Sequence, residues 1–293
     1  MSPARRALWG AAGAAAYLGA GAALGGWRPD PALLAAAGLA AWLAPRRWRP
    51  LALFAAPLLM VAAAYDAQRY WVGLRGAVHV AQPRAWELAW FGIGSGASRV
   101  TPAGFLQAHA APWIDVLAGA AYLSYLAAFL GAAAWWRFGR RLAAAQDLMW
   151  QLLWINLAGY ATYMAYPAAP PWYADRYGLG PAVLSAAPEA AGGARFDALL
   201  GVHAFRDFYA KNTNIFGAIP SLHVGQTFLL VIFAWRARSL RSAASAYFAC
   251  VVFASVYLNH HYLVDGVVGS AYAAGVVLAM EAWRRRVPAG GAG

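Results

Sequence analysis

The chain alternates long apolar runs with short arginine clusters from one end to the other. Eight apolar segments lie at about residues 7–25, 31–45, 51–65, 113–136, 147–166, 218–235, 242–259 and 262–282. Arginine clusters lie between or beside them at 5–6, 46–49, 137–141, 236–241 and 284–286. Because 62% of the residues are hydrophobic and only 12% are charged, a soluble fold of this length could not bury the apolar surface. The pattern predicts an all-α integral membrane protein with about eight transmembrane helices.

The arginine clusters also predict how the chain is oriented, because positive residues collect in cytoplasmic loops. With every cluster inside, the eight spans alternate without conflict, and both termini are cytoplasmic in what we expect to be a bacterial inner membrane. The same distribution accounts for the net charge of +12, so the charge indicates membrane topology and not nucleic-acid binding. The second and third segments are short for a full crossing, which leaves a six-span chain with a re-entrant N-terminal pair as an alternative.

The first apolar segment has a second interpretation. Its basic start and small residues after the apolar run resemble a secretory signal. We favour a retained anchor, because removal would leave an odd number of spans and move one arginine cluster to the wrong side. Cys250, the single cysteine, excludes an internal disulfide.

We expect one membrane domain over residues 1–293. Residues 1–50 form two accessory helices, 51–285 form the core, and 286–293 form a disordered tail. Two long stretches, 66–112 and 167–217, fall outside the membrane on the extracytoplasmic side. The first is rich in tryptophan and predicts one or two interfacial amphipathic helices. The second contains many aromatic residues and is too long to be a plain connection, which is typical of a functional loop.

Ionisable residues lie where two of the expected spans meet this outer face. His223 lies where the sixth span begins, and His261 and Asp265 lie where the eighth begins. Such groups cost about 2.5–3.5 kcal/mol each at membrane depth and therefore usually mark function. His261 and Asp265 are one helical turn apart, so the carboxylate can orient the imidazole and raise its basicity. With His223 as a proton donor for a leaving group, the set predicts phosphoryl or phosphodiester transfer.

Backbone N–H groups and the Ser221 hydroxyl at a helix N-terminus suit an anion such as phosphate, in agreement with this prediction. Two other interpretations of the set stay open. His261 and Asp265 alone are also common as a structural helix-end pair. The two histidines and the aspartate could also ligate a divalent metal. No carboxylate cluster of the kind that magnesium requires is evident, so we expect no metal and no cofactor.

The motifs resemble those of a known family. "PSLHVG", followed about 38 residues later by "HHYLVDGVVG", resembles motifs two and three of the type 2 phosphatidic acid phosphatase superfamily, which are metal-independent membrane enzymes with a six-helix core. The inositol phosphorylceramide synthase branch is more similar still. It has counterparts of "YPAAPPWY" (166–173), "GGARFD" (192–197), "FGAIPSLHVG" (216–225) and "HHYLVD" (260–265) in this order.

The resemblance implies a role for each residue of the set. His261 resembles the nucleophile that forms a phosphohistidine, Asp265 its orienting carboxylate, and His223 the general acid and base. Three cations of the wider superfamily are missing, because Gly159, Tyr166 and Ser255 stand at those positions. A phosphodiester monoanion needs less positive charge than a monoester dianion, so the absence favours a headgroup transferase over a phosphatase.

We therefore expect a phospho-headgroup such as phosphoinositol to move from a membrane phospholipid donor to a ceramide-like or other lipid-alcohol acceptor. A lipid phosphatase or diphosphatase using water and a non-catalytic lipid-binding protein are the alternatives. Oligomeric state does not follow from the sequence. Besides the catalytic residues, the expected substrate-binding residues are Ser221, the replacement cations Arg195 and Lys211, and Trp172, Tyr173 and His260.

Overall fold

The computed structural model describes residues 2–26 and 28–286 of the 293-residue chain. These residues form helices joined by short connections, and the only β-type pairing among them is three isolated bridges. The helices are α1 (Pro3–Gly25), α2 (Pro29–Leu43), α3 (Arg49–Trp71), η1 (Val72–Leu74), α4 (Ala81–Phe91), η2 (Gly96–Ser98), α5 (Pro102–Ala108), α6 (Pro112–Leu123), α7 (Tyr125–Phe138), α8 (Leu142–Ala165), α9 (Pro171–Tyr177), α10 (Gly193–Leu200), α11 (Ala204–Tyr209), α12 (Leu222–Arg236), α13 (Arg241–Tyr257) and α14 (Leu263–Arg286). The prediction of an all-α fold is confirmed.

Each predicted apolar segment is helical over most of its length, but fewer helices than eight have the length and hydropathy of a membrane span. In the described part of the chain, α1, α14 and the continuous helix from Arg49 to Leu74 have both, and the bent pair α6–α7 makes a fourth if it is one span. α2 and α12 are apolar but shorter. The structure therefore has three or four candidate membrane helices, and the count of eight stays a prediction.

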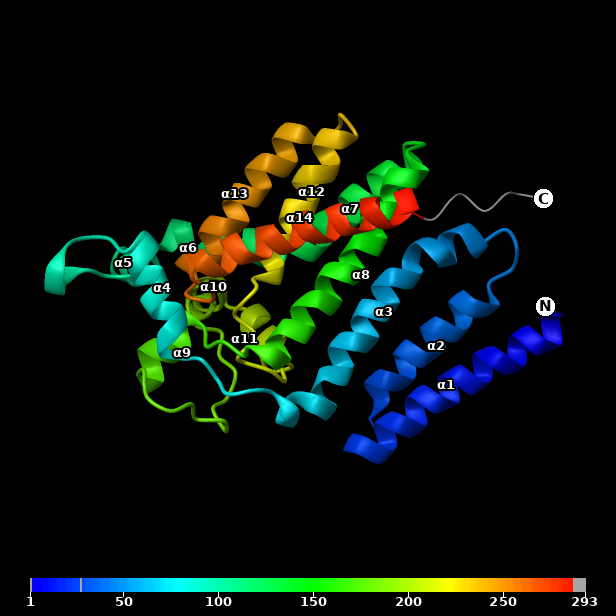
Figure 1. The fold of residues 1–293 in the computed structure, drawn as a ribbon, viewed down its shortest axis with the longest axis horizontal. Coiled ribbons are helices and arrows are strands. Elements are labelled where there is room, and N and C mark those ends of the chain that lie inside the picture. The colour runs from blue at the N-terminus through cyan, green and yellow to red at the C-terminus, as the bar shows by residue number, and fades with distance from the viewer. Residues whose placement is uncertain (1, 27, 287–293) are drawn as a thin grey trace.

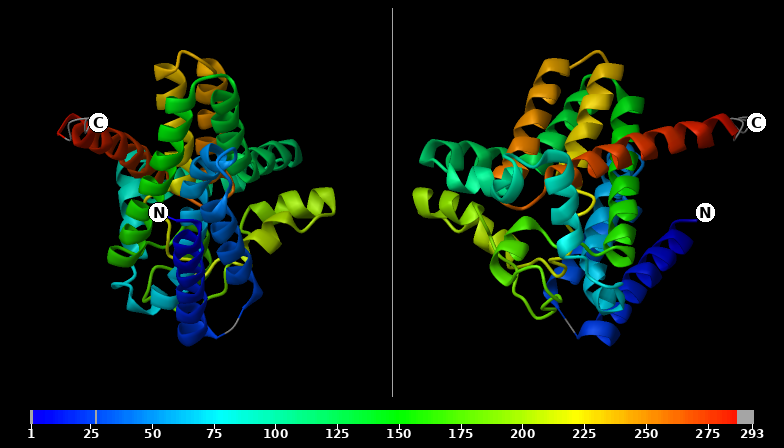
Figure 2. Two further views of the ribbon diagram at one scale, coloured as in Figure 1. Left: turned by 90° about the vertical axis from the view of Figure 1, so that its right-hand side faces the viewer. Right: turned by 60° about the vertical axis from the view of Figure 1, so that its left-hand side comes forward.

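The helices place the arginine-containing turns at one end of the molecule and the short helices of the two long loops at the other. In Figure 1 the start of α1, the turns α2–α3, α7–α8 and α12–α13, and the end of α14 lie towards the upper right. α4, α5, α9, α10 and α11 lie on the opposite side (Figure 1), and the right-hand view of Figure 2 shows the same separation. The ends that carry the arginine clusters thus lie away from the two long loops, and the orientation of the chain in a membrane stays a prediction.

The two long loops contain short helices. The 66–112 stretch contains the end of α3 followed by α4 and α5, and the 167–217 stretch contains α9, α10 and α11. Isolated bridges pair Ala168 with both His79 and Gly217, so the loops are joined to each other beneath the outer helices. Of the expected disordered tail, residue 286 is the last residue of α14, and residues 287–293 lie outside the described residues.

Helices α12 and α14 approach each other closely near their outer ends. A Cβ added at Gly269 would lie 2.2 Å from the carbonyl oxygen of Ser221, and one added at Gly225 would lie 2.8 Å from the carbonyl oxygen of Gly269. Only glycine lets two backbones come this near. The backbone N–H of Ser221 also donates to the carbonyl of Asp265 at 2.9 Å. These contacts place the start of α12 beside the start of α14, and with it the two predicted catalytic histidines.

Candidate active site

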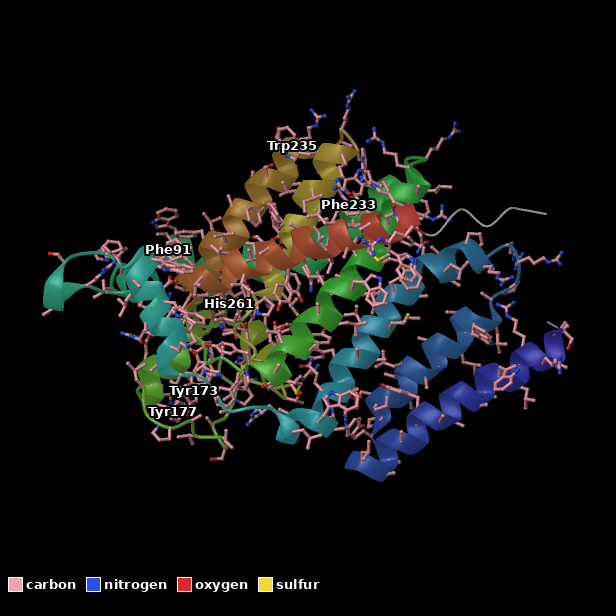
Figure 3. All side chains as sticks on the ribbon, viewed as in Figure 1. Phe91, Tyr173, Tyr177, Phe233, Trp235 and His261 are labelled. Atoms are coloured by element: carbon pink, nitrogen blue, oxygen red, sulfur yellow. The ribbon has the colours of Figure 1, made fainter. Side chains whose placement is uncertain are left out.

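The adjacent histidines lie in a tight turn between α13 and α14. The backbone N–H groups of His260 and His261 both donate to the carbonyl oxygen of Ser255, at 3.1 and 3.0 Å. The turn is possible because Asn259 adopts a left-handed conformation with φ of +62°, which asparagine tolerates better than most residues. The two imidazoles are therefore held by backbone bonds at a helix end, and His261 lies near the centre of the molecule in Figure 3.

The hydrogen-bond partners of His261 determine which of its ring nitrogens carries the proton. Its Nδ1 lies 3.1 Å from the carbonyl oxygen of Ala218 and 3.3 Å from Oδ2 of Asp265. A carbonyl oxygen can only accept a hydrogen bond, so Nδ1 carries the proton and Nε2 keeps its lone pair. The arrangement of a carboxylate, an Nδ1–H and a free Nε2 is that of an oriented base or nucleophile.

Asp265 also stabilises the start of its own helix. Its Oδ2 accepts the backbone N–H of Tyr262 at 2.8 Å, and Asp265 occupies the third position of α14. A side chain at this position that bonds back to the residue before the helix is half of a capping box. The carboxylate, which is fully buried, is thus fixed by the helix end that it caps and in turn orients His261.

A second carboxylate completes the cap of α14 from another part of the chain. Both oxygens of Glu87, on α4, accept backbone N–H groups of α14: that of Leu263 at 2.9 Å and that of Val264 at 3.0 Å. The Glu87 side chain is fully buried. Burial raises the pKa of its carboxyl above the ordinary 4.5, the neighbouring Asp265 adds to the rise, and the two N–H bonds oppose it.

His223 reaches the site from the first turn of α12, where Ser221 is the N-cap. Its ring lies 5.9 Å from the ring of His261, centroid to centroid. The Nδ1 atom is 3.1 Å from the hydroxyl of Tyr122, and Nε2 is buried without a protein partner among the described residues. The structure therefore brings together the three residues predicted to be catalytic, with one nitrogen of each histidine available for chemistry.

A cavity of about 380 Å³ adjoins these histidines. Its lining includes apolar side chains from α3, α7 and α8, among them Leu58, Val61, Leu126 and Leu152. It also includes polar residues of the second outer loop, Glu189, Lys211, Asn212 and Asn214. A site with apolar walls and a few convergent polar groups is typical of a ligand pocket, and here the combination suits an amphipathic molecule.

Three of the expected substrate-binding residues line this cavity: Trp172, Lys211 and His260. His260 stacks on Tyr209 with centroids 4.5 Å apart. Burial lowers the pKa of His260 well below its ordinary range, and the neighbouring His261 and His223 add to this effect, so the ring is neutral at physiological pH. Trp172 donates its backbone N–H to the carbonyl of Asn259 at 3.1 Å, which joins α9 to the histidine turn.

The other three expected substrate-binding residues are not among those that line the cavity. Ser221 accepts the N–H of Val224 at 3.4 Å and is fully buried, so its hydroxyl caps α12 instead of facing a ligand. The hydroxyl of Tyr173 accepts the N–H of Val183 at 2.6 Å. Tyr173 and Tyr177 lie below His261 in Figure 3, within the outer loop. Both Ser221 and Tyr173 therefore hold the loop and helix ends in place.

The contacts of Arg195 differ most from the prediction, which made it a substrate-binding cation. Its Nε donates to Asp115 on α6 at 2.6 Å, its Nη1 donates to Gln107 on α5 at 2.7 Å, and its guanidinium lies over the ring of Tyr257. Asp115 is buried and needs this partner. The partner of Arg195 is thus neither Asp197 nor Asp207, the aspartates of its own loop. The composition of the loop could not show this, because Asp115 lies 80 residues away in the sequence. Of the two expected replacement cations, Lys211 is the one that lines the cavity.

Metal binding was the remaining alternative for the histidines and aspartate. Among residues 2–26 and 28–286, no group of three or more His, Cys, Asp or Glu side chains is arranged to hold a metal ion. The Nδ1 of His261 is engaged by two oxygen atoms, so the set does not present the converging lone pairs of a ligand shell.

Sequence reasoning missed two residues that the structure places at the site, Tyr122 and Glu87. Each had a weak signal: Glu87 is an acid among tryptophans in "AWELAW", and Tyr122 lies in the apolar run "AAYLSYL". Neither has a partner at helical spacing, because their contacts are with residues more than a hundred positions away.

The fold and the site define a class of α-helical protein with several candidate membrane helices and a buried centre of two histidines and one aspartate. The chain belongs to the PAP2 superfamily, which it matches over residues 99–279. The resemblance found in the sequence motifs is thereby confirmed.

Curated relatives are consistent with this assignment. The chain is 31% identical over 253 residues to the phosphoinositol dihydroceramide synthase of Bacteroides thetaiotaomicron, covering 83% of this chain and 81% of that protein. It is 35% identical over 136 residues to the inositol phosphorylceramide synthase catalytic subunit of Schizosaccharomyces pombe, which covers 46% of this chain and 32% of that protein. With the inositol phosphorylceramide synthase of Candida albicans it shares 38% identity over 118 residues, 40% of this chain and 25% of the relative. No solved structure matches the chain.

Proposed function

We propose that the protein transfers a phospho-headgroup, phosphoinositol in the first instance, from a glycerophospholipid to a ceramide-like lipid alcohol. The observation that carries the proposal is the pair His223 and His261, 5.9 Å apart beside a cavity with apolar and polar walls. The names of the bacterial and fungal relatives support the choice of headgroup and acceptor.

The first half of the reaction forms a phosphohistidine. Nε2 of His261 attacks the phosphorus of the donor, with Asp265 stabilising the positive charge that develops on the imidazole. The bond from phosphorus to the diacylglycerol oxygen breaks, and Nε2–H of His223 gives its proton to that oxygen. His223 becomes neutral, and diacylglycerol leaves through the apolar side of the cavity.

The second half returns both histidines to their starting states. Nε2 of His223 takes the proton of the acceptor alcohol, whose oxygen attacks the phosphorus. The bond from phosphorus to Nε2 of His261 breaks, and its electron pair returns to that nitrogen. A ping-pong scheme of this kind needs one group that serves as both acid and base, which is the role we assign to His223.

The charge of the site favours a phosphodiester donor. The donor phosphate carries one negative charge, and Lys211 is a cation on the cavity wall. The positions where the wider superfamily has further cations are occupied here by Gly159, Tyr166 and Ser255. A monoester dianion would be poorly neutralised in such a site, because an uncompensated buried charge is costly.

The finer topology is part of the proposal. We propose eight spans, both termini in the cytoplasm of a bacterium, and the histidines at the outer face of the inner membrane, because the arginine clusters all lie at the opposite end. Replacing Cys250 with serine gives a cysteine-free chain. In that background, the single variants Arg47→Cys and His203→Cys should be labelled by a membrane-impermeant reagent from opposite sides of the membrane. Labelling of both from the same side would contradict this topology.

Headgroup transfer is tested with purified protein in vesicles that contain phosphatidylinositol labelled in the inositol. With dihydroceramide present, the label should appear in a new ceramide-containing lipid, and without it little label should become water-soluble. Release of inositol phosphate at equal rates with and without the acceptor would instead support the phosphatase alternative and overturn transfer.

Two substitutions complete the test. His261→Ala should abolish transfer, whereas His203→Ala, an exposed histidine of the outer loop, should leave it unchanged. Equal turnover by wild type and His261→Ala would overturn the phosphohistidine mechanism. Lipid binding without any turnover in the wild type would support the non-catalytic alternative.

A further inference from the structure

Tyr122 contacts His223 more closely than any of the predicted site residues does. Its hydroxyl lies 3.1 Å from Nδ1 of His223, and the two rings stack with centroids 4.3 Å apart and planes 22° apart. Tyr122 is 1% exposed. Stacking on Tyr122 thus fixes the plane of the His223 imidazole. The Tyr122 hydroxyl fixes Nδ1, the nitrogen that does not take part in the proposed reaction.

The break between α6 and α7 gives Tyr122 its orientation. The two helices bend by 50° at Ser124. Hydroxyls of Ser124 and Tyr247 both donate to the carbonyl of Ala121, at 3.3 and 2.8 Å, where an unbroken helix would receive the N–H of residue 125. Side chains that replace a helical bond in this way produce kinks. The bend lies two residues after Tyr122. The tyrosine is therefore in the last turn of α6, where its side chain meets His223 of α12.

The Tyr122 hydroxyl is part of a longer chain. Tyr209, at the end of α11, places its hydroxyl 3.3 Å from that of Tyr122. The ring of His260 stacks on both tyrosines, at 5.2 Å from Tyr122 and 4.5 Å from Tyr209. Tyr209 is the donor of this bond, and a phenol oxygen has two lone pairs, so the Tyr122 oxygen can accept from both Tyr209 and Nδ1–H of His223.

The two histidines therefore have different partners at the same nitrogen. Nδ1 of His261 faces a carboxylate and a carbonyl, which favour a positive charge on the ring. Nδ1 of His223 faces a neutral phenol, which accepts a hydrogen bond without favouring the charge as strongly. The first arrangement suits a nucleophile that becomes cationic. The second suits a group that must give up a proton and take it back at similar cost.

We propose that Tyr122 is a positioning residue for His223 in the headgroup transfer proposed above, holding the proton on Nδ1 so that only Nε2 exchanges protons with the substrates. In the first step Nε2–H goes to the diacylglycerol oxygen while Nδ1–H stays bonded to Tyr122. In the second step the alcohol proton goes to Nε2. The tyrosine neither gains nor loses a proton over the cycle, and its oxygen keeps accepting the hydrogen bond from Tyr209 throughout.

The test is Tyr122→Phe, which keeps the stacked ring and removes only the hydroxyl. We expect kcat to fall about 10- to 100-fold, a part of what general acid–base catalysis contributes, while KM for phosphatidylinositol changes less than about twofold. Without the phenol oxygen the imidazolium of His223 loses its acceptor, so the alkaline limb of the pH–rate profile moves to lower pH. The titratable groups near His223 are Tyr122 on α6, Tyr125 on α7, and His260 and His261 before α14. The same cavity is also lined by Tyr65 on α3, Tyr160 and Tyr163 on α8, Tyr209 on α11, and Lys211 and Glu189 of the outer loop.

Tyr272→Phe is the matched control. It also removes one tyrosine hydroxyl, which bonds to the hydroxyl of Thr162 at 2.7 Å, and it leaves both the helix break and Nδ1 of His223 untouched. We expect near-normal kcat and an unshifted pH profile for this variant. Tyr209→Phe, one hydroxyl further from His223, should have a smaller effect than Tyr122→Phe in the same direction.

Two results would overturn the proposal: a Tyr122→Phe variant with kcat and pH profile within about twofold of wild type, or an equal loss in Tyr272→Phe. Thermal unfolding of both variants shows whether a loss is due to folding. Failure of the headgroup-transfer proposal is separate, because it is seen in the wild type as hydrolysis without transfer. In that case the same pH profiles, measured with water as acceptor, still test the role of Tyr122.

Discussion

The carboxylate of Glu87 accepts the backbone N–H of Leu263 at 2.9 Å, across 176 residues of chain. Through this bond the first outer loop caps the helix that carries Asp265. Helix α4, which the sequence predicts to be interfacial, is therefore part of the support of the candidate active site. A rigid second set of contacts of this kind is what keeps catalytic groups in productive geometry.

Glu87→Gln should destabilise the protein by about 1 kcal/mol at neutral pH, because the amide keeps one acceptor for two N–H groups. It should also remove a pH dependence. Burial raises the pKa of Glu87 above 4.5, so the folded wild type holds this proton more tightly than the unfolded chain. Its stability therefore falls as pH rises from 4.5 through the raised value. Thermal unfolding between about pH 4 and about pH 7 measures both effects.

Glu281→Gln is the control for this prediction. It makes the same chemical change near the other end of α14, where Glu281 pairs with Arg236 at an exposed position. An exposed pair contributes little, so its pH dependence should follow wild type. A flat wild-type profile over the window, or an identical slope in Glu87→Gln, would contradict the assignment.

Gly269→Ala should strongly reduce activity although residue 269 is one turn from Asp265 and is not among the residues that line the cavity. The new Cβ would meet the Ser221 carbonyl at 2.2 Å, and backbone cannot move aside as a flexible side chain can. α12 must then shift away from α14, which separates His223 from His261. A shift of about 1 Å in catalytic geometry costs roughly 100-fold in rate. Gly275→Ala, where nothing lies within 4 Å, should behave as wild type in the same assay.

Lys211→Met and Arg195→Met should fail in different ways. Lys211 lines the cavity, so its loss should raise KM for the phospholipid about tenfold, equivalent to 1.4 kcal/mol, with little change in unfolding. Arg195 pairs with buried Asp115, so its loss should cost about 3 kcal/mol of stability and leave KM nearly unchanged. Arg195→Met/Asp115→Asn should recover part of that stability. A raised KM together with normal stability in Arg195→Met would instead support Arg195 as a ligand of the substrate phosphate.

Chelation tests the metal alternative for the histidine centre. With EDTA in excess, wild-type turnover should be unchanged, because the proposed mechanism uses only His223, His261 and Asp265. Activity that is lost with EDTA and regained on adding back a divalent ion would contradict the mechanism.

Much of the helical fold, and the proximity of His223, His261 and Asp265, could be predicted because the signals are local. Apolar runs separated by arginines predict helices whatever the tertiary contacts, since the backbone of an apolar segment must satisfy its own hydrogen bonds in lipid. The spacing of His261 and Asp265 places both on one helix face. The alternation of spans then predicted that His223 arrives at the same side, and the structure places its ring 5.9 Å from that of His261.

The cations and caps could not be predicted in this way. Arg195 and Lys211 lie in the same loop and look equivalent in sequence, yet one is paired with Asp115 and the other lines the cavity. The break at Ser124 has neither proline nor glycine to announce it, because its cause is a hydroxyl from Tyr247 on α13. In each case the deciding partner is distant in the chain.

By itself, then, the sequence determined that this protein is helical and apolar, that its loops divide into a basic and an aromatic side, and that two histidines and an aspartate share the aromatic side. These properties depend on residue type and short-range spacing. Only the tertiary structure decided which nitrogen of each histidine is available, that a phenol faces one and a carboxylate the other, and that Glu87 caps the catalytic helix. The physical reason is that hydrogen bonds and close packing act over about 3 Å, and only the folded chain brings residues such as Tyr122 and His223 within that distance.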